Sequence, residues 1–103
     1  VFAFPSIREF GGAVALEAMA CGVPAIVPAY GGLGELVTDE TGWLLPMGVR
    51  SELIERLRTT LESIVNDPNS IDNRGKCARD RVFEKFTWDV KARSIVEVWK
   101  TLL

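Results

Sequence analysis

Two glutamates and two glycines near the start of the chain have the types and spacing of a ligand-binding site. Seven residues separate Glu9 from Glu17, and Gly11 and Gly12 lie between them. Nearly all residues around Glu17 are apolar, a pattern that predicts a buried helix. A buried carboxylate is costly unless a hydrogen-bond donor satisfies it, and this helix contains no cation. A ligand is therefore a candidate partner for Glu17.

The glycine pair opens the predicted helix, so unpaired amides and the positive end of the helix dipole face the preceding loop. Such a helix start suits a phosphate or a diphosphate. A tight turn from a strand into the helix explains Gly11 and Gly12 equally well. Both interpretations stay open on the residues alone.

The two glutamates suit neutral hydroxyl groups better than phosphate, because like charges repel. Glu17 lies about one and a half turns into the helix, where it can accept two hydrogen bonds from a diol such as ribose. Glu9, on the loop, can accept hydrogen bonds from sugar hydroxyls. The alternatives are a Glu17 that bonds a neighbouring loop backbone and a Glu9 that is simply exposed to solvent.

A second candidate loop follows the second predicted strand and contains Gly31, Gly32 and Glu35. The glycines would let this loop approach a sugar closely. The alternative is an ordinary turn from strand to helix, with Glu35 favouring the start of the helix.

The composition excludes several classes of function. The chain has no histidine, so it holds no Ser-His or Cys-His nucleophile pair. Cys21 and Cys77 lie far apart, and we expect reduced thiols in a cytoplasmic protein, with no metal and no cofactor. The net charge of −2 argues against binding to nucleic acid or an anionic membrane. Acids at positions 72, 80 and 84 are interleaved with the basic residues between 74 and 85, which predicts a solvated helix face.

The pattern of apolar residues predicts the elements that position these groups. Strands are predicted at residues 1–4, 23–28 and 43–45. Helices are predicted at residues 13–21, ended by Gly22, and at residues 33–37. A third helix is predicted to be capped by Ser51 and to end before Pro68. A fourth runs from Ser70 or Asp72 to Phe86, and a last helix is capped by Thr87. Trp43, Trp88 and Trp99 are predicted to pack inside the protein.

Strands joined through helices imply a parallel sheet with right-handed crossovers. The predicted fold is therefore α/β: a partial Rossmann-like three-layer domain with a short parallel sheet of about three strands, helices on both faces and a helical C-terminal half. Ligands bind beyond the carboxyl ends of the strands in such sheets, and the loop from Pro5 to Gly12 lies there.

The stretch from Pro5 to Pro24 closely resembles a known family signature. It is similar to retaining, nucleotide-sugar-dependent glycosyltransferases of the two-Rossmann-domain (GT-B) architecture, and most of all to family 4, which contains hexosyltransferases. The paired glutamates with seven residues between them are that family's mark. The resemblance continues through residues 31–35, 41–46 and 86–88, and so covers most of the chain.

This resemblance implies a role for each residue of the signature. Glu9 would contact the hydroxyls of the donor sugar as the catalytic-site residue, and the backbone amides of Phe10, Gly11 and Gly12 would meet the sugar and diphosphate. Glu17 would hold the ribose of the nucleotide. Such enzymes transfer the sugar with retention of configuration and without a required metal, and the leaving phosphate accepts the proton of the acceptor.

The chain also departs from the family pattern. Enzymes of this family are several times longer, with an N-terminal domain that binds the acceptor glycan, lipid or small molecule. Their diphosphate is neutralised by an upstream arginine and lysine, whereas Arg8 is the only cation near the loop here. Residues 1–103 resemble the last part of the nucleotide-sugar-binding domain. We expect this segment alone to be inactive, and to dimerise or aggregate through the exposed edge of its first strand.

Two other functions remain as alternatives. One is a non-catalytic module that binds a nucleotide sugar or serves assembly. The other is a sugar-nucleotide epimerase of GT-B-like build, although the Glu9–Glu17 spacing is not the mark of that class.

Overall fold

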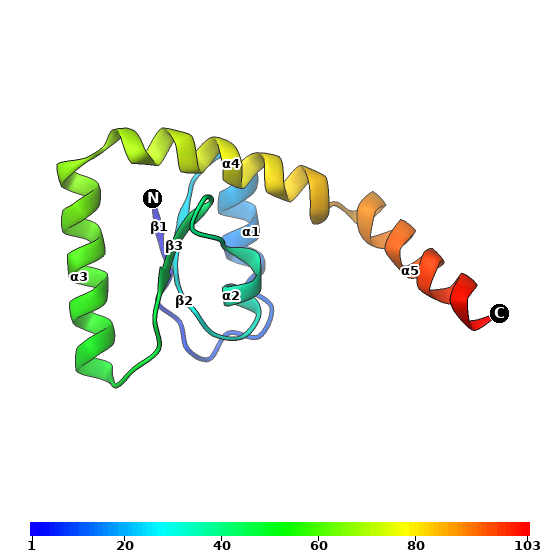
Figure 1. Ribbon diagram of the computed structural model, residues 1–103, viewed down its shortest axis with the longest axis horizontal. Helices are drawn as coiled ribbons and strands as arrows, with labels where there is room; N and C mark the ends of the chain where they lie inside the picture. The colour runs from blue at the N-terminus through cyan, green and yellow to red at the C-terminus, as the bar shows by residue number, and fades with distance from the viewer.

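A computed structural model describes all 103 residues and contains a three-stranded parallel sheet (Figure 1). The strands are β1 (Phe2–Ala3), β2 (Ala25–Pro28) and β3 (Gly42–Leu45), and they pair in the order β1-β2-β3. In this register Ile26 is paired with Ala3 on one side and Trp43 on the other. All four residues of β2 are buried, as expected for the central strand of a parallel sheet covered on both faces.

Helices cover both faces of this sheet. α1 (Ala13–Ala20) and α2 (Gly31–Leu36) lie on one face, and α3 (Arg50–Asn66) lies on the other (Figure 1). α4 (Asn69–Lys85) runs across one end of the sheet and joins α3 to α5 (Trp88–Leu102). The α/β prediction, with its parallel sheet and helical second half, is confirmed.

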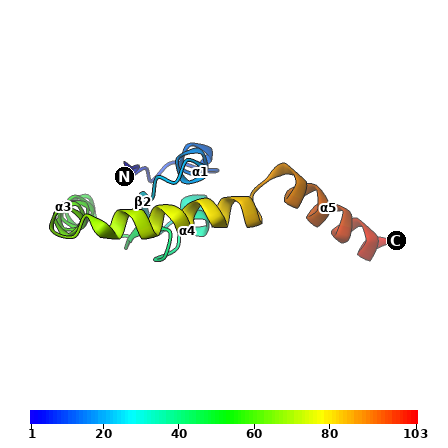
Figure 2. The same cartoon turned by 90° about the horizontal axis from the view of Figure 1, so that it is seen from above.

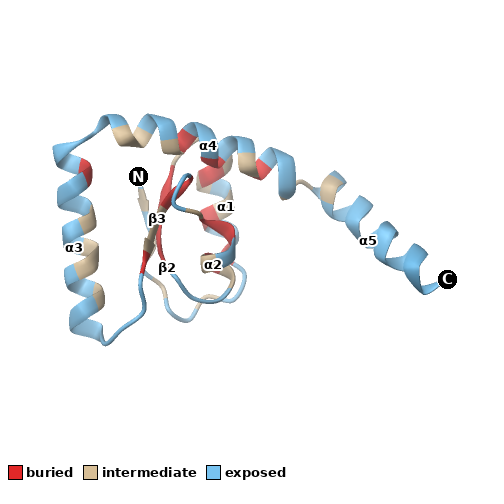
Figure 3. Cartoon of the chain, in the orientation of Figure 1, coloured by how far each residue is buried: buried red, intermediate tan, exposed pale blue.

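Each face of the sheet has its own apolar core. The larger core joins β2, α1, α2 and α4 and contains Ala15, Met19, Ala25, Val27, Leu33, Leu36, Val37, Ala78 and Val82. The smaller core, between the sheet and α3, contains Ile26, Leu45 and Ile64. Figure 3 shows the buried residues gathered on the sheet and the helix faces turned toward it.

The helix boundaries follow the predicted signals except at the starts of α2, α3 and α4; α4 begins at Asn69 after Pro68, earlier than the predicted Ser70 or Asp72. Thr87 caps α5 as predicted, because its Oγ1 accepts a hydrogen bond from the Val90 amide at 3.3 Å. The prediction that Ser51 caps α3 is wrong: the cap is Val49, whose amide donates to Glu52 Oε1 at 3.4 Å. α2 begins at Gly31, two residues earlier than predicted.

Helix α5 extends away from the rest of the molecule (Figures 1 and 2). None of its residues is buried, and Trp88 and Trp99 are 90% and 63% exposed. The prediction that these two tryptophans pack inside is therefore wrong. Trp43 is half-buried, and the Arg74 guanidinium lies 4.7 Å from the centroid of its ring. Helical spacing identifies an apolar side of a helix, but it does not specify what covers that side.

The remaining expectations concern thiols and membranes. Cys21 and Cys77 are both exposed and unpaired. Every helix is too short or too polar to cross a bilayer.

Candidate functional site

Glu9 lies on the loop between β1 and α1 and supports the start of the helix. Its carboxylate is half-buried, and Oε1 accepts a hydrogen bond from the Gly12 amide at 3.2 Å. Oε2 forms no hydrogen bond within the chain. The interpretation of Glu9 as a simple solvent-exposed acid is therefore wrong, and one carboxylate oxygen remains available to a ligand.

The structure explains why glycine is needed at position 12 of this loop, but it shows no such need at position 11. Gly12 is buried with a φ of +66°, and a Cβ there would lie 2.6 Å from Leu33 Cδ2. A left-handed backbone and a close neighbour explain why glycine stands at this position. Gly11 has neither feature, because a Cβ there would meet nothing within 4 Å. The turn interpretation thus accounts for Gly12, while the backbone of Gly11 is open to approach.

Four backbone amides at the start of α1 have no hydrogen-bond partner in the chain: those of Phe10, Gly11, Ala13 and Val14. Ala13 and Val14 belong to the first helical turn, whose unpaired amides carry the positive end of the helix dipole, and Phe10 and Gly11 lie on the loop just before it. They are the elements of an anion-binding site.

The second loop, whose Gly31, Gly32 and Glu35 belong to the short helix α2 in the structure, packs directly against the first. A Cβ on Gly32 would collide with the Phe10 carbonyl oxygen, so the two backbones are in contact at this point. Gly31 has a φ of +57° and lies near the Glu9 carbonyl. These glycines are therefore explained by the turn and by the contact between loops. The two loops, which follow the neighbouring strands β1 and β2, therefore lie together at one end of the sheet.

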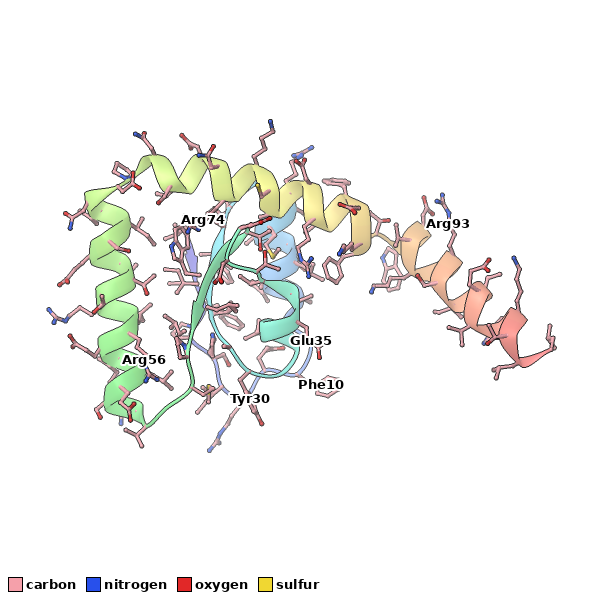
Figure 4. The ribbon with its side chains drawn as sticks, viewed as in Figure 1. Phe10, Tyr30, Glu35, Arg56, Arg74 and Arg93 are labelled. Atoms are coloured by element: carbon pink, nitrogen blue, oxygen red, sulfur yellow. The ribbon has the colours of Figure 1, made fainter.

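The two loops form one wall of an open cleft of about 670 Å³. Glu9, Phe10 and Gly11 line it from the first loop, and Tyr30, Gly31, Gly32 and Glu35 line it from the second. Figure 4 shows Phe10 and Tyr30 at the same end of the sheet, on neighbouring loops. Phe10 is 96% exposed, so its ring is free to contact a bound molecule.

Glu17 lies outside this cleft, and its predicted burial is wrong. α1 turns Ala15 and Met19 into the core, and Glu17 lies on the opposite, exposed face. Its carboxylate forms no hydrogen bond in the chain, so the alternative of a bond to a neighbouring loop is also wrong. A helix that is apolar all round does not indicate which of its faces the core covers.

The tertiary structure adds two residues that sequence reasoning missed. Phe86 and Lys91, from the junction between α4 and α5, line the same cleft. The Lys91 Nζ lies 4.9 Å from the centroid of the Phe86 ring. The only signal in the sequence was the Phe-Thr-Trp motif at residues 86–88, which contains Phe86 and ends three residues before Lys91.

Two arginines of α4 do not belong to the solvated face that was predicted. Arg81 donates hydrogen bonds to the carbonyl oxygens of Leu36 at 2.9 Å and Glu35 at 3.0 Å. Arg74 donates to the Gly42 carbonyl at 3.2 Å. These bonds connect α4 to α2 and β3, and the bonds from Arg81 hold the end of the second loop in place.

Comparisons with known proteins identify the chain's relatives. Residues 1–80 match the family described as "Glycosyl transferases group 1". The chain is 35% identical over 102 residues to D-inositol 3-phosphate glycosyltransferase of Kribbella flavida, covering 98% of this chain and 23% of that protein. It is 36% identical over 103 residues to alpha-maltose-1-phosphate synthase of Mycolicibacterium smegmatis, covering 97% and 27%.

A solved structure shows the same fold. Sucrose-phosphate synthase from Thermosynechococcus elongatus superposes with a TM-score of 0.80 at 37% identity, covering 97% of this chain and 24% of that one. The chain thus spans about a quarter of the length of each of these relatives.

Proposed function

The chain belongs to the family of group 1 glycosyl transferases, and from this premise we propose that it binds the nucleotide-sugar donor of a retaining hexosyltransferase. We assign the parent polypeptide to family 4. The relatives named above are transferases or synthases, which does not favour an epimerase.

The observation that carries the proposal is the start of α1. The unpaired amides of Phe10 and Gly11 lie on the loop between Glu9 and the first turn of α1, and all three residues line one cleft. A diphosphate placed at the amides satisfies them and the helix dipole together. The free Oε2 of Glu9 then accepts a hydrogen bond from a hydroxyl of the attached sugar.

Glu17 has the role of ribose acceptor in this proposal. Its carboxylate is exposed and unpaired on the outer face of the helix whose first turn binds the phosphates. A nucleotide that lies along α1 can bring the two ribose hydroxyls to Glu17. This placement separates the carboxylate from the diphosphate, which avoids repulsion between like charges.

The proposed transfer needs no protein nucleophile. The bond from the sugar C1 to the phosphate oxygen breaks, and the electron pair leaves with the nucleoside diphosphate. The acceptor hydroxyl forms the new bond to C1 on the same face, and its proton moves to the departing phosphate oxygen. Glu9 orients the sugar, and the amides at the start of α1 stabilise the charge that develops on the phosphate. No step uses a metal, and the acceptor is held by other parts of the parent polypeptide.

Substitution of the two glutamates in the complete polypeptide tests the assignment. Glu17→Gln removes one charged acceptor, so we expect nucleoside diphosphate binding to weaken about ten- to a hundredfold. Glu9→Gln should lower kcat more than it lowers nucleotide affinity. Glu84→Gln, an exposed glutamate on α4, is the matched control and should change neither quantity. Unchanged donor kinetics in both Glu9 and Glu17 variants would refute the site.

The isolated 103-residue chain provides a second test. We expect it to transfer no sugar, because acceptor positioning and exclusion of water require more than this cleft. Calorimetry with nucleoside diphosphates should show only weak binding, on the order of millimolar. Measurable turnover by the isolated chain would contradict this expectation.

A further inference from the structure

The balance of charge in the cleft raises a question about phosphate binding. Glu9 and Glu35 bring two carboxylates to the lining, and Lys91 is its only basic residue. A nucleoside diphosphate adds further negative charge. The start of one helix offers only about half an elementary charge in compensation. A cation of this chain close to the phosphates would therefore contribute to binding, together with the upstream arginine and lysine that the family resemblance implies.

Lys91 is the cation whose charge is free. It takes part in none of the salt bridges of the chain and donates no hydrogen bond. The neighbouring Arg81 is different, because its guanidinium already donates to the carbonyl oxygens of Glu35 and Leu36. Arg8 is on the first loop but does not line the cleft.

The position of Lys91 is set by packing at the junction of α4 and α5. Its ammonium lies 4.9 Å from the centroid of the Phe86 ring, within the range of a cation–π contact. Phe86 is itself half-buried against the larger core. Lys91 is therefore held at the cleft wall, although most of α5 extends away from the molecule.

We propose that Lys91 contacts the phosphate groups of the donor and supplies positive charge from the last helix of the chain. This inference rests on the proposed function, because it requires that the cleft binds a nucleoside diphosphate. It makes the first turn of α5 part of the donor site. Phe86 acts as a positioning residue that holds the lysine stem.

A pair of charge-removing variants in the complete polypeptide tests this role. Lys91→Met keeps the apolar stem over Phe86 and removes the charge. Arg93→Met is the matched control: Arg93 lies two residues further on α5, is exposed and forms no hydrogen bond. Figure 4 shows Arg93 pointing away from Phe10 and Glu35. Lys91→Arg keeps the charge and should bind nearly as well as the natural chain.

The measurement is calorimetric affinity for UDP, GDP and ADP, and for the nucleoside of whichever binds most tightly. We expect Lys91→Met to weaken diphosphate binding about tenfold while nucleoside affinity stays the same. Raising the ionic strength should weaken diphosphate binding less in Lys91→Met than in the natural chain. Arg93→Met should leave both affinities unchanged.

Three outcomes would overturn the role of Lys91. The first is a diphosphate affinity of Lys91→Met within about twofold of that of Arg93→Met. The second is that Lys91→Met loses as much affinity for the nucleoside as for the diphosphate. The third is that Lys91→Arg loses as much diphosphate affinity as Lys91→Met. If one of these outcomes occurs while Glu9→Gln and Glu17→Gln do alter the donor kinetics, the role of Lys91 is rejected and the proposed function is kept. Absence of diphosphate binding by the natural polypeptide rejects the proposed function as well.

Discussion

The two loops of the cleft and helix α5 are held by different amounts of packing. The loops touch backbone to backbone where Gly32 meets the Phe10 carbonyl, and they rest on the larger core through Leu33 and Leu36. α5 has an apolar side of similar character, yet none of its residues is buried (Figure 3). Only its first turn is held, through Lys91 on Phe86. The difference indicates that the loops are shaped by contacts within this chain, whereas the apolar side of α5 has no partner in it.

A single added methyl group at Gly32 should disrupt the contact between the two loops. Gly32→Ala places a methyl group against the Phe10 carbonyl, which cannot move without shifting the loop. We expect a loss of about 3 kcal/mol in the free energy of unfolding, the upper end for overpacking. Urea denaturation of the chain measures it. Gly11→Ala is the control, since its methyl group meets nothing within 4 Å and should change stability by less than about 0.5 kcal/mol. Equal stability of the two variants would contradict the packing argument.

Two surfaces could mediate self-association of the isolated chain: the open edge of β1 and the apolar side of α5. The outer edge of β1 has no strand beside it, and its unpaired backbone groups favour pairing with a second copy. We expect the isolated chain to dimerise or aggregate, and Ala3→Lys to weaken dimerisation about tenfold, or about 1.4 kcal/mol. Light scattering over a concentration series measures this. If Trp99→Lys weakens association and Ala3→Lys does not, α5 is the contact surface. A stable monomer at high concentration would contradict both.

The cap of α5 tests how independent this helix is. Thr87→Ala removes the hydrogen bond to the Val90 amide and should cost about 1 kcal/mol. Because α5 buries nothing, we expect the cost to appear as faster hydrogen exchange in α5, with the exchange of α1 unchanged. Thr59→Ala, at an exposed position of α3, should not accelerate exchange anywhere. Faster exchange throughout the chain would show that α5 unfolds together with the core.

The smallest effect concerns charges on the exposed face of α3. The hydrogen bond from Arg58, followed by its charge, lowers the pKa of Glu55 below its ordinary value. A lowered carboxyl pKa stabilises the folded chain at neutral pH, and this contribution is lost as the pH falls through the folded-state pKa. Arg58→Gln should return the pKa of Glu55 toward its ordinary value in an NMR titration, with no detectable change in the unfolding midpoint. Arg56→Gln, which breaks the pair with Glu52, should leave the pKa of Glu55 unchanged.

Much of the fold followed from local patterns. Short apolar runs ended by proline or glycine identified all three strands, and the link through helices identified their parallel pairing. Gly22 ended α1 as predicted, with a φ of +75°. The meeting of the two glycine loops was also predictable, because the carboxyl ends of neighbouring parallel strands lie at one edge of the sheet.

The errors came from features that depend on distant neighbours. Glu17 was predicted to be buried because its helix is apolar, but α4 and the sheet cover only the face that holds Ala15 and Met19. Ser51 was a reasonable cap for α3 by type, yet Glu52 reaches back to the Val49 amide instead. Trp88 and Trp99 were assigned to packing from their positions in a predicted helix, but no residue of α5 is buried.

The sequence by itself determined the strands, most of the helix boundaries and the family, and it predicted a site on the first loop. These depend on residue types a few positions apart, where backbone geometry sets the period and the turns. The tertiary structure alone decided which face of α1 is covered, that Gly12 packs on Leu33 while Gly11 stays open, and that Lys91 reaches a cleft built around Glu9. Those outcomes depend on how α4 crosses the end of the sheet and on where α5 begins. Packing between elements far apart in the chain sets that arrangement, and no local pattern contains it.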